Sequence, residues 1–111
     1  ILNMDKIQKY IYNHYNDSDI NLTSIAQHFG FNSSYLSRRF KNETGTGIID
    51  YLTKCRMEQA VEYAKSRTLM YIAAQKVGIN DPNYFSKCFR KYTGQTYSDY
   101  SAFFEPPKNL Q

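Results

Sequence analysis

The sequence has no long apolar run, no secretory leader pattern and few cysteines, and each absence removes a class of protein. No stretch approaches the roughly 18 consecutive apolar residues that suggest a membrane-spanning helix. No charged segment followed by an apolar one opens the chain, so secretion is not indicated. The two cysteines, Cys55 and Cys88, lack CxxC spacing, which favours reduced thiols near a core over a disulfide or a metal site. We therefore expect a cytoplasmic protein that has no membrane segment.

Patterns for catalysis and metal binding are also missing. His14 and His28 stand in helical patterns without a spaced carboxylate or cysteine partner. There is no GxSxG motif, no phosphate-cradling glycine loop and no metal-ligand cluster. Glu58 and Glu62 fit the solvated face of a helix better than an acid–base pair. The sequence therefore predicts a protein that is not an enzyme and that uses no metal and no cofactor.

What the sequence does contain is enough apolar residues for a core and a moderate positive charge. Its 111 residues suit one domain or two very small subdomains. Hydrophobic residues make up 41% of the chain, and the formal net charge is +4. That charge suits a polyanionic partner, but proteins of many functions carry as much, so charge alone does not decide. The chain begins with Ile1 instead of Met, and we expect it to be a piece of a longer protein.

The most informative feature is an internal repeat, in which the second half returns the signals of the first. At an offset of 48 residues the chain repeats Ala26, Gln27, Gly30 and Asn32 as Ala74, Gln75, Gly78 and Asn80. After one inserted residue it repeats, at an offset of 49, Tyr35, Ser37, Phe40, Thr44 and Gly45 as Tyr84, Ser86, Phe89, Thr93 and Gly94. A period of this length indicates two copies of one supersecondary unit. Each copy reads as a helix, a tight glycine turn and a basic helix, which is typical of helix-turn-helix proteins.

Apolar residues recur at helical spacing along almost the whole chain, and no strand-like alternation interrupts them. The pattern predicts helices over residues 5–15, 22–29, 33–43, 48–65, 70–77, 82–92 and 96–104. Gly30 and Gly78 supply the tight turns, while Asn32 and Asp81 are the expected N-caps of the basic helices. We therefore expect an all-α fold of seven helices.

These helices divide into two helix-turn-helix subdomains and a long connector helix. The predicted boundaries are 1–46 for the first subdomain, 47–66 for the connector, 67–105 for the second subdomain and 106–111 for a C-terminal tail. Pro106 and Pro107 are expected to stop regular structure in that tail. A connector of about 18 residues is roughly 27 Å long, and successive major grooves on one face of B-DNA lie about 34 Å apart. A stiff connector plus the bodies of the two units can hold that distance, whereas a flexible linker cannot.

The two basic helices have matching inner and outer faces. The inner positions are predicted to be Tyr35, Leu36 and Phe40 in the first copy and Tyr84, Phe85 and Phe89 in the second. The outer positions are small polar or basic: Ser34, Ser37, Arg38 and Lys41, and then Asn83, Ser86, Lys87 and Arg90. Arg can bond guanine bidentately, Asn can bond adenine, and Ser suits several base edges. For one isolated helix an ordinary solvated face is the better interpretation, but two capped copies favour DNA reading.

Three stretches resemble the AraC/XylS family of bacterial transcription regulators. They are LTSIAQHFGFNSSYLSRRFKNETG at 22–45, YLTKCRMEQA at 51–60 and VGINDPNYFSKCFRKYTG at 77–94. The resemblance extends from about residue 5 to residue 101 without a gap. It implies the family's DNA-binding domain, in which seven helices form two helix-turn-helix units joined by a long helix. Tyr97 and Ser101 depart from the family pattern, which has Pro and Arg there, so the resemblance says less about the last helix.

The resemblance also implies which residues face DNA. The family's base-facing sites fall on Ser34, Ser37 and Arg38 and on Asn83, Tyr84 and Lys87; we omit Tyr84 because its predicted place is in the core. The predicted base-reading set is therefore Ser34, Ser37, Arg38, Asn83 and Lys87. The predicted phosphate-contacting set is Arg39, Lys41, Ser86, Arg90 and Lys91.

Double-stranded DNA is the expected partner, and the family resemblance adds two more. Relatives usually carry a sensing or dimerisation module that these 111 residues leave no room for, and activators generally touch RNA polymerase. The rival interpretation is a helical adaptor that binds proteins through tyrosine-rich surfaces and does not bind DNA. An RNA-binding module is less favoured, because no RRM, KH or OB pattern is present.

Overall fold

The structure is a computed structural model that describes residues 3–104 of the chain. Over this range the chain forms only α-helices, seven in number: α1 (Met4–His14), α2 (Leu22–Phe29), α3 (Ser33–Thr44), α4 (Ile48–Lys65), α5 (Met70–Lys76), α6 (Pro82–Thr93) and α7 (Tyr97–Ala102). The predicted all-α class is confirmed, and each predicted helix boundary lies within two residues of the observed one. The predicted tail at 106–111, with Pro106 and Pro107, lies outside the described residues.

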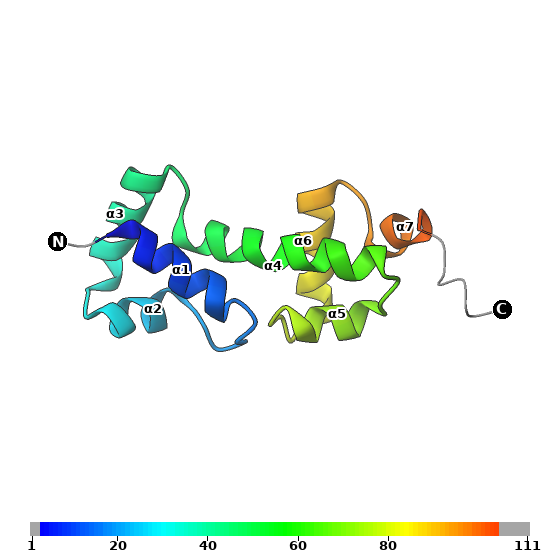
Figure 1. Cartoon of the computed structure of the whole chain (residues 1–111), viewed down its shortest axis with the longest axis horizontal. Coiled ribbons are helices and arrows are strands. Elements are labelled where there is room, and N and C mark those ends of the chain that lie inside the picture. The colour runs from blue at the N-terminus through cyan, green and yellow to red at the C-terminus, as the bar shows by residue number, and fades with distance from the viewer. Residues whose placement is uncertain (1–2, 105–111) are drawn as a thin grey trace.

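The molecule is elongated, with extents of 57 × 23 × 22 Å, and α4 runs along its length. Helices α1, α2 and α3 gather at the first half of α4, and α5, α6 and α7 gather at its second half (Figure 1). Each half thus contains one copy of the sequence repeat. The connector α4 joins the two halves and packs against the other helices of each.

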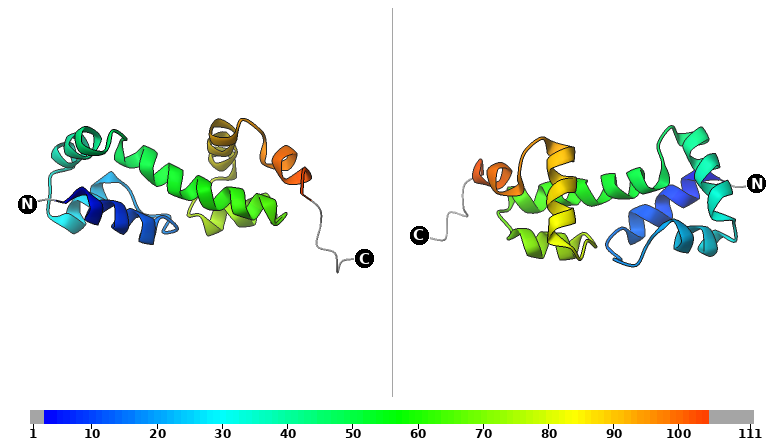
Figure 2. Two further views of the ribbon diagram at one scale, coloured as in Figure 1. Left: turned by 45° about the horizontal axis from the view of Figure 1, so that its top comes forward. Right: turned by 180° about the vertical axis from the view of Figure 1, so that it is seen from behind.

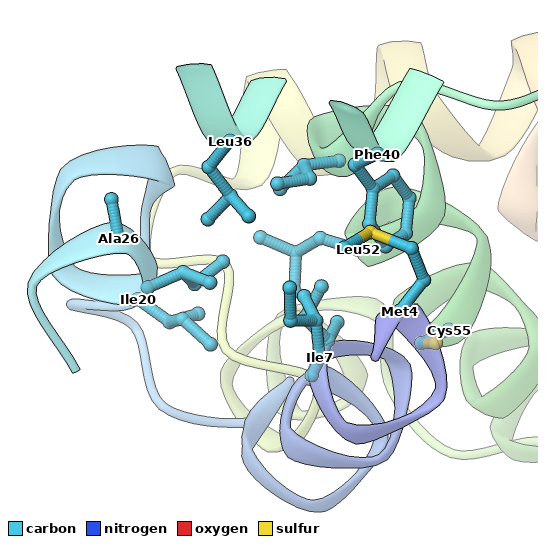
Figure 3. Packing of buried hydrophobic residues seen from close by; sticks show 11 residues of the cluster. Met4, Ile7, Ile20, Ala26, Leu36, Phe40, Leu52 and Cys55 are labelled. Atoms are coloured by element: carbon cyan, nitrogen blue, oxygen red, sulfur yellow. The ribbon is translucent and has the colours of Figure 1, made fainter. Parts of the chain in front are cut away.

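Each half has its own hydrophobic core, and α4 contributes to both. The first core includes Ile7, Leu36 and Phe40, which converge on Leu52 of α4 (Figure 3). The second is built around Met57 of α4 together with Val77, Phe85, Phe89 and Tyr97. From Ile48 to Cys55 the buried positions of α4 face the first core, and from Met57 to Ala64 they face the second. Both cores therefore depend on one continuous helix.

Polar side chains cap the N-terminal ends of α3 and α6 at the residues that the sequence predicts. The Asn32 side chain accepts hydrogen bonds from the backbone N–H groups of Ser34 (2.9 Å) and Tyr35 (3.2 Å). The Asp81 carboxylate accepts one from the N–H of Asn83 (2.9 Å), and Pro82 occupies the first turn of α6, where its missing N–H costs no hydrogen bond. These caps satisfy N–H groups that have no partner inside the helix. They fix where α3 and α6 begin.

A half-buried arginine closes the seam between the two halves. Arg56, in the middle of α4, donates from Nε to the carbonyl oxygen of Tyr15 (2.8 Å) and from Nη2 to that of Asp17 (3.1 Å). Tyr15 packs against both cores. Burial lowers the pKa of Arg56 from its ordinary value, but a guanidinium remains cationic at neutral pH. The loop after α1 is thereby tied to the centre of the connector.

The same loop presses against the glycine turn of the second half. Gly78 has φ +89°, and a Cβ built on it would stand 2.7 Å from the carbonyl oxygen of Tyr15 and 2.9 Å from the carbonyl carbon of Asn16. Its counterpart in the first half, Gly30, has φ +74° and open space where a Cβ would stand. Both positions need the left-handed backbone that glycine adopts without strain. Only Gly78 also needs the absence of a side chain.

The last helix is secured by two residues that depart from the family pattern. Tyr97 is buried, and its hydroxyl donates to the carbonyl oxygen of Thr68 (2.7 Å). Burial raises the pKa of Tyr97 to about 12. The Ser101 hydroxyl donates to the carbonyl oxygen of Ala64 (3.0 Å), near the end of α4. The Ser101 bond attaches α7 to the connector, and the Tyr97 bond attaches it to the loop that follows the connector.

The two turn glycines give a matched test of the seam. Gly30→Ala should lower the free energy of unfolding by about 1 kcal/mol, because alanine is strained in the left-handed region. Gly78→Ala carries the same strain and adds a steric overlap with the Tyr15–Asn16 backbone, so it should cost about 2 kcal/mol more. Chemical denaturation followed by circular dichroism measures both. Equal losses for the two variants would mean that the halves do not touch at Gly78.

Candidate nucleic-acid interface

The two basic helices, α3 and α6, project from the same side of the molecule. Seen from behind, α6 crosses in front of α4 and α3 lies in front of α1 (Figure 2, right). The other view has both helices on one side of α4 (Figure 2, left), and they run in the same general direction. Each presents its buried face to its own core through an i, i+4 pair, Leu36 with Phe40 and Phe85 with Phe89. The opposite faces of both helices are open to solvent.

In α3 the structure exposes most of the predicted reading face. Ser34 and Arg38 are exposed, and Ser37 is half-buried at the edge of the helix. Arg38 forms no hydrogen bond or ion pair with any residue in the described part of the chain. A free guanidinium on this face can therefore bind an outside acceptor.

In α6 the equivalent positions are exposed as well. Asn83 and Lys87 face solvent at the places that Ser34 and Arg38 occupy in α3. Among residues 3–104 no acceptor lies within hydrogen-bonding distance of the Lys87 ammonium group, and α6 itself contains no acidic residue. The repeat thus produces two similar surfaces, each with a polar residue near the helix start and a cation one turn later.

The predicted core positions of Tyr35 and Tyr84 are wrong. Tyr35 is 39% exposed and Tyr84 is 50% exposed. Each precedes a fully buried residue, Leu36 or Phe85, and so lies about 100° around the helix from it, at the edge of the apolar stripe. The phenol rings cover the flank of the helix and do not enter the core. The same error occurs in both copies because the copies share the pattern.

Tyr84 therefore belongs to the outward surface from which the sequence argument excluded it. The family resemblance indicates this residue as base-facing, and only its predicted burial argues against it. Its hydroxyl lies close to the Cys88 thiol, and a hydrogen bond between the two raises the pKa of Tyr84. Tyr84, like Tyr35, is an outward residue that the helical pattern missed.

Three of the predicted phosphate contacts are exposed, and the other two are half-buried with side-chain partners inside the protein. Lys41, Arg90 and Lys91 face solvent, although Lys41 Nζ also approaches the carbonyl oxygen of Gly45 (3.3 Å). Arg39 pairs with Glu43 (Nε to Oε2, 2.6 Å) and donates to the Tyr35 hydroxyl (3.1 Å). Ser86 is half-buried, with its Oγ 3.3 Å from Met70 Sδ. Arg39 and Ser86 would have to give up these contacts to bind phosphate.

The described residues offer little for other chemistry. No group of three or more His, Cys, Asp or Glu side chains is close enough to hold a metal ion within residues 3–104. Cys55 and Cys88 are free thiols, buried and half-buried respectively, as predicted. In the part of the chain that the structure describes, no helix is both long and apolar enough to cross a bilayer. The exposed cations of α3 and α6 are therefore the candidate functional groups of this surface.

Comparison with known proteins finds a matching helix-turn-helix family and a similar regulatory protein. A protein family described as a helix-turn-helix domain matches residues 25–102. The arabinose operon regulatory protein of Escherichia coli is 35% identical over 103 residues, which cover 91% of this chain and 35% of that protein. The chain thus spans about a third of the length of this relative.

Solved structures share the fold. The C-terminal domain of AraT, a response regulator from Geobacillus stearothermophilus, superposes with a TM-score of 0.88 at 31% identity, covering 96% of this chain and 89% of that one. The DNA-binding domain of AdpA, a global transcriptional factor solved in complex with a target DNA, has a TM-score of 0.81 at 19% identity and covers 89% of each chain. At that identity the second likeness concerns the fold alone.

Proposed function

The chain belongs to the AraC/XylS family and forms the DNA-binding domain of a transcription regulator, and from this premise we propose how it binds. Helices α3 and α6, hereafter the recognition helices, enter successive major grooves on one face of a DNA duplex. The observation that carries this proposal is their common orientation, because both helices project from one side of α4 (Figure 2). Their cations other than Arg39 are exposed to solvent. Two helices on opposite sides could not meet the same face of DNA.

Base recognition in this proposal comes from matching positions on the two helices. Arg38 can donate two parallel hydrogen bonds to guanine O6 and N7, and Lys87 can donate to the same acceptors. Ser34, Ser37 and Asn83 supply shorter polar groups near the start of each helix, where a recognition helix lies deepest in the groove. Tyr84 joins this set because it is exposed. Its ring and hydroxyl can contact a base edge or the adjacent backbone.

Phosphate contacts set the position of the protein on the duplex. Lys41, Arg90 and Lys91 are exposed at the sides of the recognition helices, where the sugar–phosphate strands bordering a major groove would pass. Such contacts contribute affinity and register and no direct sequence information. Arg39 and Ser86 belong to this group as weaker candidates, since each first has to leave a partner within the protein.

The connector sets the distance between the two contacts. Its 18 residues span roughly 27 Å, and the recognition helices extend beyond the points at which they pack on it. The Arg56 hydrogen bonds and the close approach at Gly78 restrain rotation of one half against the other. A duplex with two recognition boxes about one helical turn apart fits this arrangement.

The intact protein is a further part of the proposal. Because this chain spans only about a third of the arabinose operon regulator it resembles, we propose that a sensing or dimerisation domain accompanies it in the full protein. Contact with RNA polymerase would then convert DNA binding into regulation of transcription. Both functions place the protein in the cytoplasm of a bacterium.

Selection of bound duplexes from a random pool tests the proposal. Two short conserved boxes, separated by about 10 base pairs centre to centre, are expected in the recovered sequences. A single box would mean that only one helix reads bases. Recovery of no preferred sequence, with no salt-dependent association, would contradict the proposal and favour the helical adaptor.

Removing a base contact and removing a phosphate contact should affect DNA binding differently. Arg38→Ala should cost about 1–3 kcal/mol of binding free energy on the selected duplex and relax the preference at one base pair, because a bidentate contact is lost. Lys91→Ala should weaken binding to selected and random duplexes alike and reduce the slope of log K against log salt by about 1. Fluorescence anisotropy at several salt concentrations measures both. Equal effects of the two variants on both duplexes would refute this division.

A further inference from the structure

Between the two recognition helices, α4 and α6 form a groove that neither the helical pattern nor the predicted site anticipated. It has a volume of about 510 Å³ and is lined by Ile49, Asp50, Thr53, Lys54, Tyr84, Lys87, Cys88, Lys91 and Tyr92. The first four residues belong to the first half of α4, and the other five lie on α6. We call this feature the α4–α6 groove. It begins at a recognition helix and extends along the connector toward α3.

The side chains that line the groove carry more positive than negative charge. Lys54, Lys87 and Lys91 are exposed, and within residues 3–104 none of them forms an ion pair or a hydrogen bond. Asp50 is the one carboxylate on the lining. Its Oδ2 lies near Gly47, 3.5 Å from where a Cβ would be on that residue, at the N-terminal turn of α4. The positive end of the α4 dipole offsets this negative charge, which leaves the lysines to face an outside anion.

The charge changes sign farther along the connector. A second hollow, of about 410 Å³, lies farther along α4 and is lined by Glu58, Glu62 and the C-terminal end of α6. Tyr92 borders both hollows. Cations therefore gather between the first half of α4 and α6, with Lys54 on the connector and Lys87 and Lys91 on α6, whereas carboxylates line the hollow beyond the crossing of α6. An anionic chain lying along this surface would be attracted only to the stretch between the recognition helices.

We propose that the α4–α6 groove holds the sugar–phosphate backbone of the DNA segment between the two major grooves, with Lys54 as the central contact. This inference rests on the proposed function. If α3 and α6 occupy successive major grooves on one face of the duplex, the intervening minor groove and its bordering strands must pass in front of the first half of α4. The connector then binds DNA itself, in addition to spacing the recognition helices.

The lining has the chemistry of a phosphate and sugar site. Lysine ammonium groups and the hydroxyls of threonine and tyrosine are common donors to phosphate oxygens, and Thr53, Tyr84 and Tyr92 supply the hydroxyls here. The exposed apolar surface of Ile49 (44%) and Tyr92 (47%) can pack against deoxyribose. Lys87 and Lys91 belong both to the groove and to the outer face of α6, so a backbone strand leaving the major groove continues directly into it. This continuity favours DNA over an acidic peptide as the occupant.

Lys54→Ala tests the inference, with Lys65→Ala as the matched control. Both lysines lie on α4 and are exposed, but Lys65 pairs with Glu62 (Nζ to Oε2, 3.5 Å) away from the groove. On the selected duplex and on a random duplex, Lys54→Ala should reduce the slope of log K against log salt by about 0.9, the value for one lost phosphate contact. Lys65→Ala removes the same charge and should leave the slope unchanged. Lys54→Arg, which keeps the cation, should restore it.

Replacing charged phosphates of the duplex with neutral linkages shows where on the DNA Lys54 makes its contact. Methylphosphonates placed only between the two boxes should weaken binding by the wild type and have little further effect on Lys54→Ala, because the same contact is already gone. If Lys54→Ala keeps the wild-type slope while the wild type still prefers the selected duplex, the groove does not hold DNA and the proposed function stands. An acidic peptide as the occupant would give that same result. If the wild type shows no preference for any duplex, the proposed function itself fails.

Discussion

The arrangement of the whole molecule depends on the contact that Arg56 makes across the middle of α4. Its guanidinium bonds to the carbonyl oxygens of Tyr15 and Asp17, about 40 residues away in sequence, in a half-buried position. A charge withdrawn from water must find hydrogen-bond partners to offset its lost solvation, and these carbonyls supply them. Together with the packing of Ile48, Leu52 and Cys55 in the first core, these bonds fix where the first half lies relative to the connector. Because α4 also forms a wall of the second core, fixing the connector fixes both halves.

On this frame the repeat builds two similar surfaces that differ in charge. Both copies begin their recognition helix with a side-chain cap, bury an i, i+4 apolar pair and end at a left-handed glycine. In α3 one of the three cations, Arg39, is tied to Glu43, whereas in α6 Lys87, Arg90 and Lys91 have no acidic neighbour on the helix. With Lys54 added from the connector, positive charge is concentrated on and beside the second recognition helix. Duplication thus preserved the internal packing more closely than the outer surface.

The helices and turns could be predicted from the sequence because their causes are local. Apolar spacing, the caps at Asn32 and Asp81 and the glycine at 30 each act within a few residues, and the observed helix ends agree with them. The pattern failed at Tyr35 and Tyr84, since a large amphipathic ring at the edge of an apolar stripe can lie either inward or along the flank. The Arg56 bonds and the α4–α6 groove could not be predicted from spacing. They arise where segments distant in the chain meet, and only the folded structure brings those segments together.

The most direct measurement is the affinity for duplexes in which the separation of the two selected boxes is varied one base pair at a time. It compares the wild type with Arg56→Met, and Arg67→Met serves as the control. Arg67 also donates to backbone carbonyl oxygens, but these lie within the second half, at Ser101 (3.4 Å) and Phe104 (3.0 Å). If the Arg56 contact holds the recognition helices in one relation, the wild type and Arg67→Met should share a sharp optimum, and Arg56→Met should give a broad one. A sharp, unshifted optimum for a folded Arg56→Met protein would show that the two halves are held in place by something else.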